Sequence, residues 1–246
     1  MAAPALTLLV FIAAHECVID AVAARISPEL ERELGAATLA RIKATTRLVD
    51  DGPQYAAVDT IGQRLAPVGP YHYRFHLGAD DTINAFALPG GDIVVNRGLL
   101  AASTRPEELA GVLAHEIQHV ELRHSLKGRL RDTGVALLWT VLVGDPRASL
   151  VGELSTRLLT LKFSRDAESA ADAGGFALLL TRGIDPAGMV DFFRRLAQSG
   201  GATPPALLSS HPPSTEREAA LAALLSAVDQ HCCQPLDRNT SWPPRD

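Results

Sequence analysis

The sequence predicts an α+β fold that is mostly helical, with a small antiparallel sheet or hairpin. Helix-start signals recur along the chain, whereas only the region 71–100 has the composition of strands. The chain has 246 residues, of which 47% are hydrophobic, enough to bury a substantial core. We expect one main domain over residues 27–230, between an apolar N-terminal segment (1–26) and a C-terminal tail (231–246).

The first two helices are predicted from their boundary residues. Ser27, Pro28 and Glu29 supply an N-cap, a first-turn proline and a first-turn acid, so a helix is expected to begin there and to end at Gly35. The stretch "YAAVDTIGQRLAPV" has a helical pattern that Pro67 closes.

Strand patterns follow these helices. "YHYRFHLGA" alternates and is rich in aromatic residues, which predicts a strand. In "TINAFALPGGDIVVNRGLL", two short apolar runs are separated by "PGGD", which has the composition of a turn. A hairpin is therefore expected in this stretch.

The remaining elements are predicted to be helices. Thr104 and Glu107 form a capping box around Pro106 and open the helix that contains "LAGVLAHEIQHVELRHSLKGRL". Three further helices are expected from their patterns and caps: one from about Glu153 to Arg182 that stops at Gly183, one that begins at Asp185 and Pro186, and one capped by Thr215 and Glu218.

Two apolar runs raise the question of a membrane. Residues 2–14 are fewer than the roughly 20 that a spanning helix needs, and no basic region of a signal peptide precedes them. The trimmed end of a membrane anchor, an interfacial helix and a core helix all fit this segment. The run 134–144 fits either a buried helix or a hairpin that touches a membrane.

Charge and cysteine content narrow the functional classes. A net charge of -5 gives no basic excess, so nucleic acid is not an expected partner. Cys17, Cys232 and Cys233 form neither a disulfide framework nor a zinc-ribbon pattern. The adjacent pair fits either a redox or metal role or a loose tail.

The motif His115-Glu116-x-x-His119 predicts a metal site. Residues four apart share one face of a helix, so both imidazoles can reach the same zinc ion, while Glu116 faces the attacking water as its general base. The motif arises by chance in on the order of 1% of chains of this size. The alternative is an ordinary helix with surface histidines.

A catalytic zinc ion typically needs a third protein ligand. The metzincin pattern would place a glycine and a histidine at positions that Leu122 and Ser125 occupy, and His124 misses this spacing by one residue. The third ligand is therefore expected from elsewhere in the chain.

A later helix supplies a candidate in "FSRDAESAADAGGFALLL". Glu168 and Asp172 are four residues apart and share a helical face, so Glu168 can bind zinc while Asp172 orients a ligating imidazole. Asp166 is the competing carboxylate, but no partner stands four residues after it.

Four ordered stretches carry a resemblance over about residues 56–225: "INAFALPGGDIVVNRGLL", "ELAGVLAHEIQHVELRHS", "FSRDAESAADAGG" and "SSHPPSTERE". With them the chain resembles the gluzincin metallopeptidases that include the HtpX heat-shock protease, the CAAX prenyl endopeptidases and bacterial zinc-dependent proteases with chaperone function. The resemblance implies a zincin-type domain with one Zn²⁺ per chain, held by His115, His119 and Glu168, and with Glu116 as general base. It also implies that the segment Asn84, Ala85 and Phe86 lines the cleft, where an extended polypeptide could add as a strand. A purely structural hairpin is the alternative.

His211 and Arg217 complete the candidate site. The resemblance includes a histidine-proline unit followed by an arginine, which His211, Pro212 and Arg217 match. His211 is expected to be an oxyanion donor, a fourth zinc ligand that holds the enzyme inactive, or a packing residue. Arg217 is expected to pair with Asp172 or with another acid of the cleft.

These features predict a zinc metalloendopeptidase. By the resemblance, it would act on unfolded or damaged proteins in quality control of the bacterial cell envelope, anchored in the membrane or peripheral to it. The alternative is a non-catalytic, zinc-stabilised, chaperone-like protein that binds clients. The sequence disfavours this alternative, since a purely structural site would not need Glu116.

Overall fold

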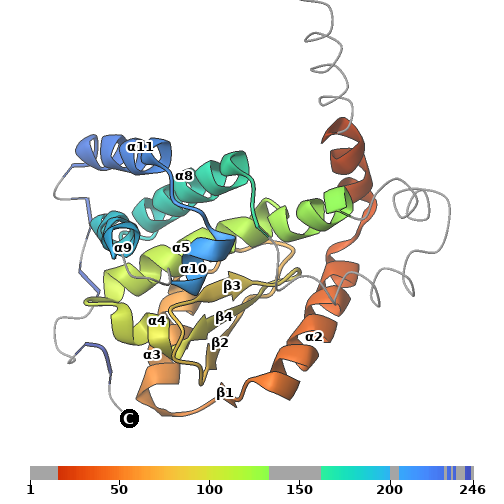
Figure 1. Cartoon of the computed structure of the whole chain (residues 1–246), viewed down its shortest axis with the longest axis horizontal. Coiled ribbons are helices and arrows are strands. Elements are labelled where there is room, and N and C mark those ends of the chain that lie inside the picture. Colours follow the sequence, from red (N-terminus) through yellow and green to blue (C-terminus); the bar gives the residue numbers. More distant parts are fainter. Residues whose placement is uncertain are drawn as a thin grey trace, which may run out of the picture.

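The computed structural model describes residues 16–132, 162–199, 205–229, 232–233, 235–236 and 242–244. They form a four-stranded sheet with helices on both faces (Figure 1). The predicted α+β class is thus confirmed. The apolar runs 2–14 and 134–144 lie outside the described residues. Among the described helices, none combines the length and the apolarity that crossing a bilayer requires.

The sheet is mixed rather than antiparallel throughout. Its strands are β1 (Leu48–Val49), β2 (Arg74–Gly78), β3 (Ala85–Ala87) and β4 (Asp92–Asn96), in the order β1-β2-β4-β3. The predicted β3–β4 hairpin is present and β1 pairs antiparallel with β2, but β2 and β4 are parallel. After β2, the chain runs back as β3 along the outer edge and returns as β4 into the space between them. The prediction of an antiparallel sheet is therefore wrong for this central pair.

The first long helix, α2 (Pro28–Thr45), begins at the predicted cap but does not end at Gly35. Ser27 accepts a hydrogen bond from Leu30 N, as an N-cap does. Gly35 lies inside the helix, where an added Cβ would overlap the carbonyl oxygen of Pro89 in the hairpin turn. The glycine therefore serves close packing between helix and turn, and it does not stop the helix.

The two faces of the sheet carry different cores. On one face, Ile93 and Val95 pack in the main core with α3 (Gly52–Leu65) and with α5 (Pro106–Glu121). On the other face, Val94 packs against α2 in a smaller cluster. Strand β4 is buried on both sides, which explains why its sequence is a continuous apolar run and does not alternate between apolar and polar residues.

The cap of α5 differs from the prediction by one residue. The helix follows the short helix α4 (Arg97–Ala102) and begins at Pro106, so the residue that reaches back to the cap is Glu108. Its carboxylate accepts hydrogen bonds from the backbone N–H and the hydroxyl of Thr104. Glu107 instead accepts a hydrogen bond from the backbone of Leu236 in the C-terminal tail.

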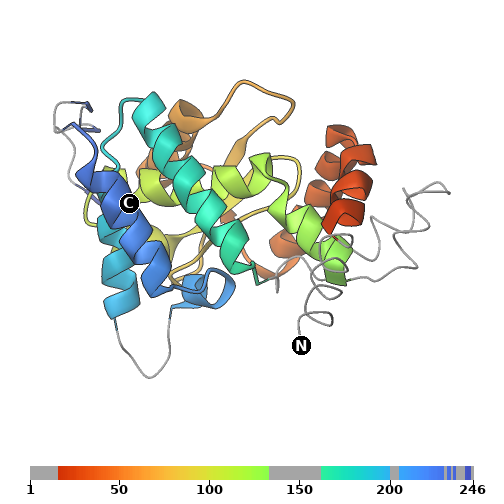
Figure 2. The ribbon, with the colours of Figure 1, turned by 90° about the horizontal axis from the view of Figure 1, so that it is seen from above.

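Of the four later helices, α8 (Arg165–Thr181) and α9 (Ala187–Gln198) pack on α5 on the side away from the sheet, and α11 (Thr215–Ser226) packs on these two (Figures 1 and 2). The short helix α10 (Ala206–Ser210) lies instead beside the loop before β3, where Leu207 N donates to Ile83 O. Residues 162–164 are not helical and Ser164 caps α8, so the prediction of one continuous helix from Glu153 is wrong. The helix α8 ends just before Gly183, as predicted, and the φ of 65° at this residue favours glycine. Ser214, rather than Thr215, caps the last helix.

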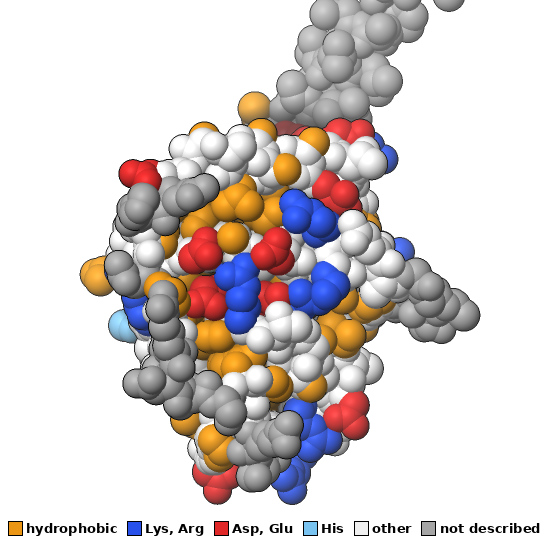
Figure 3. All heavy atoms as spheres, turned by 90° about the vertical axis from the view of Figure 1, so that its left-hand side faces the viewer, with side chains coloured by type: hydrophobic (Ala, Val, Ile, Leu, Met, Phe, Trp, Pro, Cys, Tyr) orange, Lys and Arg blue, Asp and Glu red, His pale blue; other side chains and the backbone are white. Residues whose placement is uncertain are grey.

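Acidic and basic side chains are mixed on the face shown in Figure 3, where they do not separate into single-sign patches. Ion pairs such as Arg105–Asp191 and Arg195–Glu108 join α9 to the start of α5. These pairs fix α9 against the N-terminal part of the helix that carries the HExxH motif.

Gly35→Ala tests the close packing of α2 on the hairpin turn. The added methyl group would force the two segments apart, so the free energy of unfolding should fall by about 1–3 kcal/mol. Gly69→Ala is the matched control, because no atom lies within 4 Å of a Cβ placed there; its effect should stay within about 0.5 kcal/mol. Denaturant titration measures both, and equal stabilities would contradict the packing argument.

Candidate metal centre

The HExxH motif lies in the C-terminal half of α5, between the sheet and α8. There, His115, Glu116 and His119 are at most 1% exposed. A polar group buried to this extent is costly unless it has a partner. The surroundings of these three side chains therefore have to supply hydrogen bonds, ion pairs or a metal ion.

Two glycines allow α8 to approach α5 closely. A Cβ on Gly175 would lie 3.0 Å from the backbone nitrogen of His115, and a Cβ on Gly174 would overlap the side chain of Gln118. This close contact brings Glu168 and Asp172, which lie about two turns and one turn earlier on α8, to the HExxH motif. The Gly174-Gly175 pair thus explains in packing terms why "ADAGG" follows the two acids.

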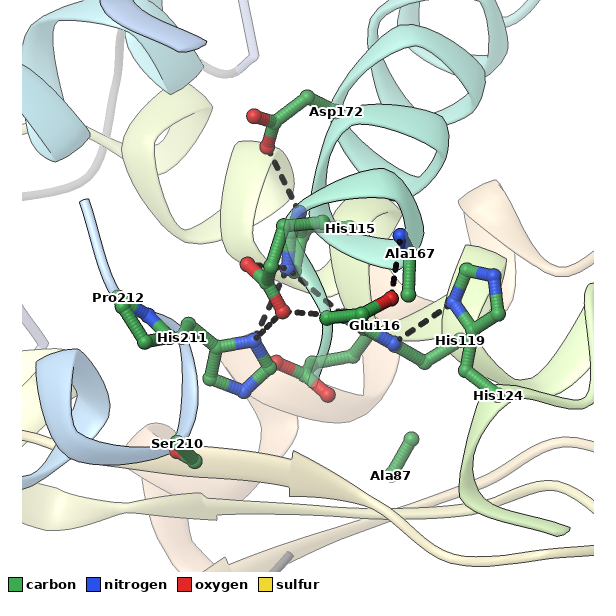
Figure 4. A network of polar contacts seen from close by, with 12 residues as sticks. Ala87, His115, Glu116, His119, His124, Ala167, Asp172, Ser210, His211 and Pro212 are labelled. Atoms are coloured by element: carbon green, nitrogen blue, oxygen red, sulfur yellow. Dashed lines mark hydrogen bonds and ion pairs between the residues drawn. The ribbon is translucent and has the colours of Figure 1, made fainter. Parts of the chain in front are cut away.

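Side chains from three segments lie together: His115, His119, Glu168 and His211. Figure 4 shows the three imidazoles facing one another. Nε2 of His115 lies 3.0 Å from Nε2 of His119 and 3.2 Å from Nδ1 of His211. Oε1 of Glu168 lies 3.0 Å from Nδ1 of His211 and 3.5 Å from Nε2 of His119. The exposed Asp166 is not part of this cluster.

The spacing and charge of this cluster fit a divalent metal ion. Ligands about 2.0–2.1 Å from a tetrahedral zinc ion lie about 3.3 Å from one another, close to the distances between these donors. When ionised, the buried carboxylates of Glu116, Glu168 and Asp172 leave a net charge of −2 against the single guanidinium of Arg217. A divalent cation at the four donors would neutralise that charge.

Arg217 links three parts of the site. Its guanidinium donates to both carboxylate oxygens of Asp172, at 2.6 and 2.8 Å, and lies 2.7 Å from Oε2 of Glu168. It also donates to the carbonyl oxygen of Pro212, next to His211. Asp172 in turn lies 3.0 Å from Nδ1 of His115, which leaves Nε2 of that imidazole directed at the cluster.

The protonation states of His119 and Glu168 suit metal binding. Burial lowers the pKa of His119 well below its ordinary value, so the imidazole is neutral at neutral pH. Burial raises the pKa of Glu168, but hydrogen bonds from His119 and His211 outweigh it, and the pKa of this carboxyl is lowered. A neutral imidazole and an ionised carboxylate are the forms in which His119 and Glu168 bind metal.

Glu116 and His211 influence each other. Nε2 of His211 lies 3.4 Å from Oε1 of Glu116. Burial raises the pKa of Glu116, and the positive charges of His211 and His115 only partly offset this effect. Burial lowers the pKa of His211, but the carboxylates of Glu116 and Glu168 outweigh it and raise that pKa. Glu116 is thus better able to take up a proton than an ordinary carboxylate.

Two residues that the sequence did not assign to the site also contact it. Nδ1 of His124 lies 3.0 Å from Nδ1 of His119, and the ring of Phe163 stacks on His119 with centroids 4.0 Å apart. Both contacts limit rotation of this imidazole. In the sequence, His124 stands out only as a histidine close to metzincin spacing, and nothing marks Phe163.

Of the hairpin residues, Ala85 and Phe86 lie on strand β3 at the edge of the sheet, and Asn84 directly precedes this strand. The side chain of Ala85 is buried in the main core, so only its backbone can meet a ligand. Asn84 O accepts a hydrogen bond from Asn96 on β4. By alternation along the ladder, the backbone groups of Ala85 and Ala87 point away from β4.

Residues 55–225 match peptidase family M48, a span that runs from α3 to the last turns of α11. The chain belongs to peptidase family M48. This membership, together with its relatives, assigns the chain to the metalloproteases. The narrower likeness to HtpX and the CAAX prenyl endopeptidases stays a prediction.

Three relatives illustrate the range of similarity. Metalloprotease YcaL of Escherichia coli (strain K12) is 34% identical over 186 residues, which cover 69% of this chain and 72% of YcaL. The Beta-barrel assembly-enhancing protease of Yersinia pestis is 32% identical over 77% of this chain and 42% of its own length. Mitochondrial metalloendopeptidase OMA1 of Arabidopsis thaliana is 37% identical over 57% of this chain and 29% of its own length. The chain therefore spans less than half of two of these relatives.

Metal retention distinguishes a ligand from an orienting residue on α8. Glu168→Ala removes a donor, so it should weaken metal binding more than Asp172→Ala, for which a loss of about 10- to 100-fold in affinity is expected. Asp166→Ala removes an exposed acid of the same helix and should leave retention unchanged. Competition with a chelator measures all three. A weaker metal affinity in Asp172→Ala than in Glu168→Ala would mean that the two roles are exchanged.

Proposed function

We propose that the protein is a zinc-dependent endopeptidase that hydrolyses peptide bonds of unfolded or damaged proteins. One observation carries this proposal: four buried donors converge beside a fifth buried group, Glu116, that is not among them. A site that only stabilised the fold would need the four donors, whereas hydrolysis also needs a base at this place.

The chain's own residues divide the chemistry between them. A zinc ion held by His115, His119 and Glu168 would supply a Lewis acid that polarises the scissile carbonyl and lowers the pKa of water. Glu116 takes the proton of the attacking water and delivers it to the leaving amine. Its raised pKa suits both transfers, because the carboxyl can hold a proton between them. Both oxygens of Glu116 are buried without a hydrogen-bond partner among the described residues.

An extended polypeptide is the substrate that the edge strand favours. Strand β3 has no neighbour on its outer side within the sheet. The backbone groups of Ala85 point away from β4 and can pair with a substrate strand, whereas the carbonyl oxygen of Ala87 accepts a hydrogen bond from the hydroxyl of Ser125. A folded protein seldom offers a free extended segment, so this mode of binding supports unfolded or damaged chains as substrates.

The cell envelope is the proposed place of action. YcaL and the Beta-barrel assembly-enhancing protease are bacterial proteins, and the second name refers to assembly of β-barrels. We place this chain in bacterial envelope quality control on that basis, anchored in the membrane or peripheral to it through the segment 1–26. A protein that only held clients would bind unfolded chains without cutting them. Mass spectrometry of new N-termini after incubation with unfolded casein distinguishes the two functions.

We assign His211 to an inhibitory fourth donor rather than to the oxyanion. Its Nδ1 lies within 3.2 Å of donors on both His115 and Glu168. In this arrangement, the imidazole occupies the position that water or a substrate carbonyl would need. Movement of His211 out of the cluster would then open the site.

Glu116→Gln tests the general base. The amide keeps the size of the side chain but cannot accept the proton, so turnover of unfolded casein should fall by at least about 100-fold while zinc content stays at one ion per chain. Glu33→Gln makes the same chemical change at an exposed position of α2 and should cleave at the original rate. Unchanged turnover in Glu116→Gln would falsify the assignment.

His211→Ala tests the inhibitory donor. Three ligands would remain, so zinc should be retained and kcat should rise, because water gains access to the fourth position. His72→Ala, which truncates an exposed histidine, is the control. A fall in kcat at unchanged zinc content would instead support the oxyanion role, and unchanged values of both would leave His211 as a packing residue.

A further inference from the structure

A cavity of about 220 Å³ adjoins the candidate metal centre. Beside the cluster, its lining includes His211, Ser210 and Phe163. From there it extends across the edge of the sheet to the C-terminal end of α2, on the face opposite the main core. A substrate strand beside β3 would therefore have this cavity within reach of one of its side chains.

The middle of the cavity is apolar. Ile42 of α2, Phe86 of β3 and Val94 of β4 contribute their side chains to it. These residues belong to the small cluster on the α2 face of the sheet. An aliphatic stem can pack against such a surface without loss of hydrogen bonds.

The lining also contains two hydrogen-bond acceptors that are not paired with a charged donor, the side chains of Asn84 and Asp80. Oδ1 of Asn84 is buried and has no hydrogen-bond partner among the described residues. Asp80 accepts a hydrogen bond from the backbone of Thr82, which lowers the pKa of its carboxyl and keeps it ionised. Within the described part of the chain, no lysine or arginine forms an ion pair with Asp80.

The neighbouring acid shows the contrast. Asp81 is exposed and pairs with Arg97 at 2.8 Å, and it does not line the cavity. Asp80, at the cavity, therefore has no ion-pair partner among the described residues, whereas Asp81 has one. An unpaired carboxylate and an unpaired amide oxygen above an apolar wall match a side chain with an aliphatic stem and a cationic head.

We propose that this cavity is a specificity subsite that accepts a lysine or arginine side chain of the substrate near the scissile bond, with Asp80 and Asn84 receiving its cationic head. This inference rests on the proposed peptidase function. The subsite is joined to the segment that carries His211, because the backbone N–H of Leu207 at the start of α10 donates to the carbonyl oxygen of Ile83 in the loop that precedes β3. The loop with Asp80 and the segment with His211 are therefore held together.

The first test profiles cleavage. The zinc-loaded protein is incubated with a library of unstructured peptides, and the cut sites are read by mass spectrometry. Lysine and arginine should be enriched at one position beside the scissile bond. Replacing that lysine by norleucine, which has the stem without the ammonium, should lower kcat/KM by about tenfold. Enrichment of apolar or acidic residues there, or of none, would overturn the proposal.

Matched variants tie the preference to the cavity. Asp80→Asn removes the charge and should reduce the ratio of lysine to norleucine cleavage by about tenfold. Asp81→Asn makes the same change one residue away and should leave the ratio unchanged. Asn84→Asp adds a second charge and should raise the ratio. Equal ratios in Asp80→Asn and Asp81→Asn would exclude Asp80 as the determinant.

Binding separates this inference from the proposed function. Fluorescence anisotropy with Glu116→Gln compares lysine and norleucine versions of one labelled peptide without any turnover. If neither the wild-type protein nor His211→Ala cuts any peptide, the proposed function fails, and tighter binding of the lysine peptide would still establish the subsite. If peptides are cut but both versions bind equally, the subsite fails and the peptidase function stands.

Discussion

The buried ion pair between Arg217 and Asp172 is the contact on which the candidate metal centre depends. The guanidinium, 7% exposed, holds Asp172 through two hydrogen bonds and also reaches Glu168, so it joins α11 to α8. Asp172 then orients His115 on α5. Removing one partner of a buried pair typically costs about 3–5 kcal/mol, because the other charge stays unpaired. This pair therefore holds α11, α8 and the imidazole of His115 in one arrangement.

The surrounding fold serves this arrangement by close packing. Gly175 lets α8 approach α5 at His115, and Gly35 lets α2 approach the hairpin turn at Pro89. The edge strand and α5 are thereby fixed at the two sides of the donors. The same contacts create the cavity behind β3, so the metal ligands, the substrate strand and a side-chain pocket would all be positioned by one set of packed elements.

Periodicity and spacing predicted those parts of the site that lie on single helices. HExxH and the Glu168–Asp172 pair could be found because residues four apart share a helical face. For His211 the sequence left three roles open, a fourth zinc ligand among them, since its position depends on how the segments around α10 and α11 pack on α8. Packing also explains the errors in the fold: Gly35 looked like a helix stop because its close neighbour Pro89 is distant in sequence. The parallel β2–β4 pair was missed because a hairpin pattern does not state where its strands enter a sheet.

X-ray absorption spectroscopy of the protein loaded with one zinc ion per chain tests the central claim, that the buried donors form a catalytic metal site. The predicted first shell has nitrogen and oxygen ligands at about 2.0–2.1 Å, with three imidazoles in the wild-type protein and two in His211→Ala. Sulfur at about 2.3 Å, which would place the ion at Cys232 and Cys233, or a first shell with fewer than two imidazoles, would contradict the account.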